Sequence, residues 1–328
     1  MTGRSGGRLE VLAPDGVGEV RAGDDLAELL LRALAGAGWQ LSAGDIVVVT
    51  SKVVAKAEGR VRRGTREDEL SGETVRVVAR RGHTAIVRNR LGLTMAAAGI
   101  DASNVPAGHV VLLPEDPDSS ARELCARLRA RTGVRIGVVV TDTAGRAWRD
   151  GQTDLAIGAA GVQVLESFAG RQDPHGNSLV VTAPAVADEL ASTAELAQGK
   201  LGARPFAVVR GRADLVLSDD GPGAARLIRA EGSDFFGYGA REAVVRALAG
   251  EPDDRAPFGA AATADDLCHA IGVVLGRSAR VDEDERRIEV GIADEAERTR
   301  LAVLAFAHGW SCRRPDPGTI AVLQPLTP

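Results

Sequence analysis

Residues 138–162 read VVVTDTAGRAWRDGQTDLAIGAAGV, and the apolar run at their start ends abruptly in Asp142 and Thr143. Ile136 and the three valines after Gly137 include no charge, which is typical of a strand buried on both faces. The run therefore predicts a buried strand that delivers a carboxylate into a polar pocket.

The residues after this strand have the parts of an anion or metal-phosphate site. Gly145 frees the backbone, and Arg146, Trp148 and Arg149 follow Asp142 closely. Backbone amides and cations beside a carboxylate can together hold a phosphate group and its metal ion. An ordinary strand exit with a surface ion pair is the alternative interpretation.

A second stretch, GLTMAAAGIDASNV at residues 92–105, also ends in an acid after a run of small residues. Asp101 is followed three positions later by Asn104, and small residues allow a ligand or a backbone segment to approach closely. Since Asp, Ser and Asn also bond their own backbone in turns, a plain turn is the alternative. In both stretches, the spacing of the residues alone does not distinguish a functional site from an ordinary turn or strand exit.

The composition is typical of a soluble enzyme. A chain of 328 residues with 45% apolar and 26% charged residues can bury one large core or two smaller ones. The net charge of −5 gives no general footprint for nucleic acid. No run reaches the roughly 18 apolar residues of a membrane span, and the N-terminus lacks the apolar core of a signal peptide. We therefore expect a cytoplasmic protein. Its three widely spaced cysteines indicate neither a disulfide framework nor a zinc site.

Hydrophobic periodicity and turn residues predict a mixture of helices and strands. A first helix should start at Asp25, capped by Asp24, and end at Gly36 and Gly38. Further helices are expected over residues 73–81, 119–131, 185–196, 223–229 and 240–249. Strands are expected over residues 8–12, 45–50, 84–88, 109–113, 179–182 and 206–210, besides the strand that ends at Asp142.

Residues 251–262, EPDDRAPFGAAA, concentrate proline, glycine, alanine and acid, and they predict a linker. The linker should separate a large domain at residues 1–250 from a small module at residues 263–328. Within that module, expected helices near 264–275 and 296–308 and strands near 287–292 and 319–323 predict a compact α+β unit. The sequence assigns this module no role.

Several motifs in one order make the chain resemble the coenzyme F420-0:L-glutamate ligases. Two hallmark strings of that family are present, AGIDASNV at 98–105 and TDTAGRAWR at 141–149. The resemblance continues with SKVVAKAEGR at 51–60, LLPEDPDSSA at 112–121, GQTDLAIGAAGV at 151–162, DPHGNSLVVT at 173–182 and FAVVRG at 206–211. It covers about the first 250 residues, and it implies an α+β fold with a mixed sheet, followed by the small C-terminal α+β module.

The resemblance also implies a reaction, the GTP-dependent addition of L-glutamate to the carboxylate of the deazaflavin precursor coenzyme F420-0. GTP would convert that carboxylate to an acyl phosphate, and the α-amine of glutamate would then displace phosphate. Further γ-linked glutamates are an open extension. Mg²⁺ or Mn²⁺ in two sites, K⁺, and a homodimer with active sites near the subunit interface are family expectations. Some relatives carry a flavin-binding nitroreductase-like domain after the ligase, but fewer than 80 residues are too few for it. We therefore expect no flavin.

The metal ligands are assigned by the same resemblance. Asp101 and Asp142 match ligands of one divalent ion, Thr143 matches a ligand of a second, and such oxygen donors suit Mg²⁺ or Mn²⁺. At residues 197–205, AQGKLGARP, archaeal relatives have a carboxylate that helps to hold the second ion, whereas this chain has Lys200. An ammonium cannot ligate a metal. Either Lys200 replaces that ion's charge as a phosphate contact, or Thr143 and the phosphates hold the ion alone.

The resemblance further implies nucleotide contacts and catalytic residues. Lys56 and Arg146 are the expected catalytic residues, as neutralisers or clamps of phosphate and carboxylate charge. The alternatives are a solvated lysine at position 56 and an arginine that braces Asp150 or Asp154. Gly18 stands where relatives often have proline, so a simple surface turn is the alternative for its loop. The expected nucleotide contacts are Val17, Gly18, Glu19, Val20, Ser51, Lys56, Asn104, Gly199 and Lys200.

Two other functions stay open at this point. One is a related GTP-dependent ligase for a different amino acid or acceptor, which Lys200 and the replacement of a common asparagine by Ala97 favour. The other is a non-catalytic nucleotide-binding scaffold whose C-terminal module binds partners. The intact Asp101, Asp142 and Thr143 argue against the scaffold.

Overall fold

The computed structural model of the protein describes residues 7–282, 284, 286–313 and 316–326. Its residues form two compact units. The first contains the chain up to Val77 together with Gly82–Ile228, and the second contains Val78–Arg81 and the chain from Arg229 onward. The sequence-based division into residues 1–250, 251–262 and 263–328 stays a prediction.

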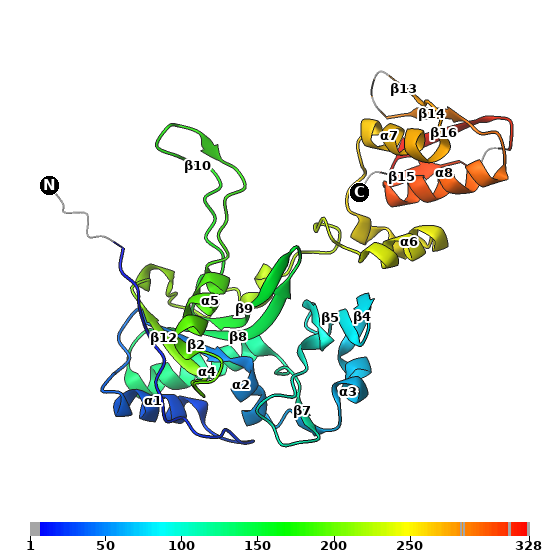
Figure 1. Cartoon of the computed structure of the whole chain (residues 1–328). Coiled ribbons are helices and arrows are strands. Elements are labelled where there is room, and N and C mark those ends of the chain that lie inside the picture. Colours follow the sequence, from blue (N-terminus) through cyan, green and yellow to red (C-terminus); the bar gives the residue numbers. More distant parts are fainter. Residues whose placement is uncertain (1–6, 283, 285, 314–315, 327–328) are drawn as a thin grey trace. The chain divides into compact units, whose positions relative to one another are not determined.

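A five-stranded mixed sheet forms the centre of the first unit (Figure 1). Only β2 and β8 pair in parallel, and the other neighbours in the sheet are antiparallel. The α+β class with a mixed sheet is therefore confirmed. In spatial order the strands are β1 (Glu10–Leu12), β12 (Phe206–Arg210), β2 (Ile46–Thr50), β8 (Gly137–Arg146) and β9 (Arg149–Ala160).

Helices cover both faces of this sheet (Figure 1). Successive residues of a strand point to opposite faces, so the valines of β2 and β8 divide between two cores. Val47, Val49, Val138 and Val140 lie in the core that contains residues of α1 (Leu26–Gly36) and α4 (Pro117–Thr132). The opposite core contains Ile46, Val48 and Val139 together with residues of α5 (Val186–Gln198). The strand that leads to Asp142 is thus buried on both faces, as predicted.

The cap of α1 differs from the prediction by one residue. Asp25, in extended conformation, accepts hydrogen bonds at Oδ1 from the backbone amides of Ala27 and Glu28 over 3.0 and 3.1 Å. Asp24 instead accepts from the amide of Arg21 and closes the preceding turn. The expected cap at Asp24 was therefore wrong, because two adjacent aspartates compete and only Asp25 is placed to reach the first free helix amides.

Two expected helices are absent from the described residues, and several strands, β9 among them, were not predicted. Residues 73–81 form strand β4 (Thr74–Arg81), since the valines and the β-branched Thr74 favour a pleated strand. Residues 223–229 contain only the 3₁₀ turn η3 (Ala224–Leu227). The sequence predicted the strand that contains Asp142 but not its partner β9, which pairs antiparallel with it after a tight turn.

The smaller elements of this unit form short ladders and connections. They are α2 (Ser51–Ala57), β3 (Val61–Arg63), α3 (Arg66–Glu73), β5 (Thr84–Asn89), β6 (Thr94–Ala96), η1 (Ala97–Gly99), β7 (His109–Val111), β10 (Arg171–Gln172), β11 (Ser178–Leu179) and η2 (Ala213–Leu215). Strands β4, β5 and β6 form one sheet, β3 pairs with β7, and β10 pairs with β11. The segment that contains Asp101 is fixed to β7 by a bridge between Asp101 and Val111.

The second unit has a core of its own. Its four-stranded sheet has the order β13-β14-β16-β15, and Leu267, Ile271, Leu301 and the fully buried Trp310 pack together on it. The predicted helices and strands of the module are present. Its elements are α6 (Ala240–Ala249), η4 (Pro252–Asp254), η5 (Ala256–Phe258), α7 (Ala264–Leu275), β13 (Arg280–Val281), β14 (Ile288–Gly291), α8 (Glu295–Ala307), β15 (Trp310–Cys312) and β16 (Ile320–Pro325).

None of the helices in the described part of the chain combines the length and the apolar character that crossing a membrane requires.

Candidate active site

The parallel pair β2 and β8 places two predicted residues side by side. Thr50 pairs with Thr141, so the residues that follow, Ser51 and Asp142, leave the same edge of the sheet. Ser51 Oγ donates a hydrogen bond to Asp142 Oδ1 over 2.8 Å. Carboxyl ends of adjacent parallel strands are the usual position of sites in sheets of this kind.

Asp142 lies where negative charge is poorly balanced. Burial raises the pKa of its carboxyl group to about 7, and the hydrogen bond from Ser51 opposes this rise. The negative charges of Asp154 and Asp101 add to the increase in pKa. The ionised form of Asp142 thus needs additional positive charge, which a divalent cation can supply.

Asp154 is a central residue of the site that the sequence analysis did not select. Asp154 is only 4% exposed. Thr143 Oγ1 donates a hydrogen bond to its Oδ1 over 2.7 Å, and Thr141 Oγ1 donates to its Oδ2 over 3.2 Å. Lys200 Nζ lies 2.9 Å from Thr143 Oγ1 and 3.4 Å from Asp154 Oδ1. A hairpin prediction for residues 137–160 would have found Asp154, because it faces Thr143 in the β8–β9 register.

Asp101 forms a second polar cluster. Lys52 Nζ lies 2.5 Å from Asp101 Oδ2, and Arg66 Nη2 lies 3.4 Å from Oδ1. Both the amide and the hydroxyl of Ser103 donate to the same carboxylate over 2.8 Å. Burial raises the pKa of Asp101, but Lys52 and the two hydrogen bonds from Ser103 outweigh burial and leave the pKa below its ordinary value. Lys52, which the sequence analysis did not select, therefore balances the charge of a predicted metal ligand.

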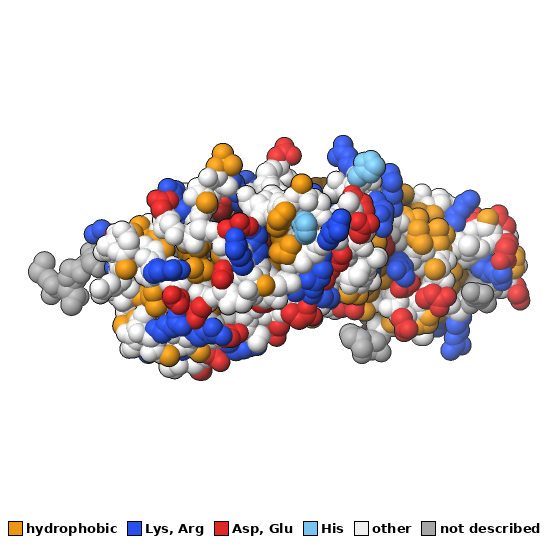
Figure 2. Space-filling view, turned by 90° about the horizontal axis from the view of Figure 1, so that it is seen from below, with side chains coloured by type: hydrophobic (Ala, Val, Ile, Leu, Met, Phe, Trp, Pro, Cys, Tyr) orange, Lys and Arg blue, Asp and Glu red, His pale blue; other side chains and the backbone are white. Residues whose placement is uncertain are grey.

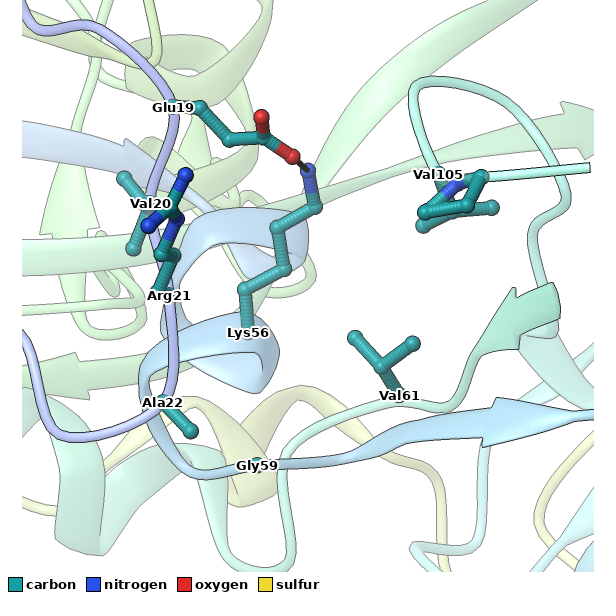
Figure 3. Close-up of a pocket in the computed structure, with 9 residues that line it drawn as sticks. Glu19, Val20, Arg21, Ala22, Lys56, Gly59, Val61 and Val105 are labelled. Atoms are coloured by element: carbon teal, nitrogen blue, oxygen red, sulfur yellow. Dashed lines mark ion pairs between the residues drawn. The ribbon is translucent and has the colours of Figure 1, made fainter.

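A pocket of about 300 Å³ lies beside these clusters and joins several predicted nucleotide contacts (Figure 3). Lys56 extends into it from α2, with its Nζ 2.6 Å from the carbonyl oxygen of Asn104 and 3.9 Å from Glu19 Oε1. Lys56 is only 9% exposed, so the alternative of a solvated lysine is wrong. The lining residues are Glu19, Val20, Arg21, Ala22, Lys56, Gly59, Val61, Val105 and Pro106.

The remaining predicted residues divide between the site and positions away from it. Val17 is buried in the core of the first unit, and Gly18 adopts a positive φ of 74° on the surface. Gly199, with φ 62°, ends α5 directly before Lys200. Arg146 lies at the exposed end of the β8–β9 hairpin, where Nη2 donates to the carbonyl oxygen of Asp150 over 3.1 Å. The structure therefore places Arg146 apart from the side chains bonded to Asp142.

The donor set fits a divalent ion that completes its coordination with substrate oxygens. Among the described residues, no three acidic, histidine or cysteine side chains converge on one point. Asp142, with Asp101 near enough for its charge to raise the pKa of Asp142, and the hydroxyl of Thr143 nevertheless offer hard oxygen donors. Mg²⁺ is commonly bound by one or two carboxylates plus phosphates and water. Asp101 and Asp142 are the residues that would hold such an ion, and the expected role of Thr143 at a second ion stays a prediction.

Charges alternate over the visible surface. Figure 2 shows Lys and Arg side chains interspersed with Asp and Glu on one face of the molecule. Such a mixture differs from the continuous basic surface that nucleic-acid binding requires.

Comparisons with known proteins agree with the arrangement of these motifs. The model of the F420-0:gamma-glutamyl ligase family matches residues 16–67 and 69–211. A protein of Methanopyrus kandleri named coenzyme F420:L-glutamate ligase is 39% identical over 240 residues, which are 66% of this chain and 93% of the relative.

Two further relatives carry the same name. The protein of Archaeoglobus fulgidus is 39% identical over 225 residues, 62% of this chain and 88% of the relative. The protein of Methanothermobacter thermautotrophicus is 36% identical over 250 residues, 70% of this chain and 98% of the relative. The matched family segments contain Ser51, Lys56, Asp101, Asp142 and Lys200.

Proposed function

The chain belongs to the F420-0:gamma-glutamyl ligase family, and on that premise we propose that it joins L-glutamate to coenzyme F420-0 in coenzyme F420 biosynthesis. The observation that carries this proposal is the arrangement around the short helix α2. Ser51, the first residue of this helix, bonds Asp142, and Lys56, five residues later, extends into the pocket. Helix α2 thus supplies both the hydroxyl that bonds the proposed metal-binding carboxylate of β8 and the lysine proposed to neutralise phosphate charge.

GTP is the proposed source of energy. A carboxylate oxygen of F420-0 attacks the γ-phosphorus, the bond to the β-phosphate oxygen breaks, and GDP leaves. The amine nitrogen of glutamate then attacks the acyl carbon, the bond from that carbon to the phosphate oxygen breaks, phosphate leaves with the electron pair, and the amine loses a proton. The products are the amide, GDP and phosphate.

Residues of this chain have distinct roles in the proposal. Lys56 neutralises phosphate charge at the pocket, and Glu19 and Val20 line the space for the nucleoside. Ser51 orients the Asp142 carboxylate through its hydrogen bond. A divalent ion, Mg²⁺ or Mn²⁺, supplies charge neutralisation for the transferred phosphoryl group when it is bound. The family resemblance alone supports a homodimer, the participation of K⁺ and a cytoplasmic location.

The proposal is tested with the full chain, GTP, Mn²⁺, L-glutamate and F420-0. Mass spectrometry should detect the mass gain of one or more glutamyl units, together with release of GDP. Asp142→Ala should abolish both signals, whereas Asp253→Ala, at an exposed position of η4, should leave both unchanged. A mass gain with another amino acid alone would replace glutamate in the proposal, and nucleotide binding without any mass gain would reject it.

A further inference from the structure

Lysine occurs at only three positions of this chain, 52, 56 and 200, although lysine and arginine together number 40. All three lysines border the candidate active site. Lys52 pairs with Asp101, Lys56 bonds the carbonyl of Asn104, and Lys200 bonds Thr143. In a chain whose other cationic side chains are arginines, a compact ammonium is thus found where oxygen atoms of the site converge.

Lys200 has the most complete oxygen environment of the three. Its Nζ lies 2.9 Å from Thr143 Oγ1, 3.4 Å from Asp154 Oδ1 and 2.7 Å from Glu195 Oε1. An ammonium has three N–H donors, so these three acceptors match its capacity. The side chain of Asp154 is only 5% exposed, and a carboxylate so buried is costly unless a cation or hydrogen bonds balance it.

The backbone around Lys200 is shaped to hold it in this position. Helix α5 ends at Gln198 and is capped by Gly199, whose positive φ of 62° favours glycine. A Cβ atom on Gly202 would come within 2.8 Å of the carbonyl oxygen of Gln198, so the loop closes tightly behind Lys200. Glu195 lies on the last turn of the same helix, and its ion pair with Lys200 joins the loop to the helix.

We propose that Lys200 is a positioning residue whose tethered ammonium is the permanent cation of the oxygen set formed by Thr143, Asp154 and Glu195. That oxygen set consequently accepts no divalent ion while Lys200 is present. The role deepens the proposed ligase function, and it leaves the pair Asp101 and Asp142 as the place for a divalent ion. The sequence left two alternatives open: Lys200 replaces the charge of the second metal ion, or Thr143 and the phosphates hold that ion. The proposed role corresponds to the first, because Lys200 supplies the positive charge.

The proposed role has a consequence for Asp142. The negative charge of Asp154 raises the pKa of Asp142, and Lys200 offsets part of that charge. The hydroxyl of Thr143 accepts from Lys200 and donates to Asp154, so its orientation is fixed. Lys200 therefore acts through Asp154 and Thr143, without contacting the reacting atoms.

The test measures how many Mn²⁺ ions bind per full-length chain in saturating GDP, by electron paramagnetic resonance of free Mn²⁺. Lys200→Met and Lys200→Glu should each bind one ion more than the wild type, because the oxygen set loses its cation. Lys200→Arg is the matched control, and it should bind as many ions as the wild type since positive charge remains. Circular dichroism melts of all variants establish that each one is folded.

Equal numbers of ions in the wild type, Lys200→Met and Lys200→Glu would overturn the role of Lys200. The difference between variant and wild type tests Lys200, whereas the mass-gain assay tests the ligase proposal. A wild type that makes no glutamylated product, with the extra ion still present in Lys200→Met, would therefore reject the ligase function and retain the tethered cation. If the wild type makes the glutamylated product but the variants bind no additional ion, the ligase function is retained and the role of Lys200 as a tethered cation is rejected.

Discussion

The two ends of the β8–β9 hairpin differ sharply although they belong to one continuous motif, TDTAGRAWR at residues 141–149. At its base, Thr141, Asp142 and Thr143 lie among buried or partly buried oxygen atoms. At its tip, Trp148 is 85% exposed and adopts a positive φ of 63°. Four residues of extended strand span about 13 Å, which is enough to carry the second half of the motif away from the first. Neighbours in a sequence motif are therefore not necessarily neighbours in a site.

The largest effect should come from the base of the hairpin. Asp142→Ala removes the carboxylate that Ser51 orients, and we expect kcat/KM for glutamylation to fall by about 10²–10³-fold. Steady-state assays of GDP release measure the change. Activity within a few-fold of the wild type would contradict the assignment of the base as the active site.

Substitution of Asp154 should have a smaller effect on activity than substitution of Asp142, and it should also lower the stability of the fold. Asp154→Ala leaves the hydroxyls of Thr141 and Thr143 without their acceptor and removes one of the three acceptors of the Lys200 ammonium. We expect the free energy of unfolding to decrease by about 1–3 kcal/mol and the activity to fall as well. Urea denaturation measures the first change. A variant as stable as the wild type would show that the buried carboxylate is not the centre of this network.

The α1 cap provides a stability change that should not affect chemistry. Asp25→Ala should lower the free energy of unfolding by about 1 kcal/mol, and Asp24→Ala should lower it less, because only Asp25 accepts from helix amides. Neither substitution should alter kcat. A larger decrease in the free energy of unfolding for Asp24→Ala than for Asp25→Ala would support Asp24 as the cap, as the sequence predicted.

The contribution of Asp25 also has a pH dependence. Burial raises the pKa of Asp25, but the amide of Glu28 and the guanidinium of Arg131 outweigh burial and leave the pKa below its ordinary 3.8. Since the folded-state pKa is the lower one, the stabilisation is present above pH 3.8 and is lost as the pH falls through the folded-state value. The difference in stability between wild type and Asp25→Ala should therefore shrink in acid.

The smallest effect is expected at the tip. Arg146 donates a hydrogen bond to the carbonyl oxygen of Asp150 at an exposed turn, so Arg146→Ala should change kcat/KM by less than about threefold. The same GDP-release assay measures it. A hundredfold loss would mean that the tip reaches an active site, as it would in a homodimer with sites near the subunit interface.

Long apolar strands and their polar ends could be predicted from the sequence. Ile46–Thr50 and the run to Asp142 carry unbroken β-branched residues, and their parallel pairing then brings Ser51 to Asp142. Asp154 was not selected because its position opposite Thr143 depends on the pairing register of a hairpin that we did not predict. The β8–β9 ladder shifts between Val140 and Thr141, and a shift of one residue moves a side chain to the other face.

Two other errors have local causes. Residues 73–81 contain a helix end and a strand start, and the charged residues around the valines resemble a solvated helix face. The contact between Lys200 and Asp154 joins residues 46 positions apart, and only the tertiary fold brings them together. Local pattern thus determines where a strand ends, whereas the partners of a buried charge depend on packing.

The most direct measurement is a crystal structure of the full chain with GDP and Mn²⁺, using anomalous scattering to locate the metal. We expect a Mn²⁺ peak at Asp142, at the base of the hairpin, with the guanine nucleotide in the pocket lined by Lys56 and Glu19. A peak at the hairpin tip, or a nucleotide bound elsewhere on the chain, would contradict this expectation.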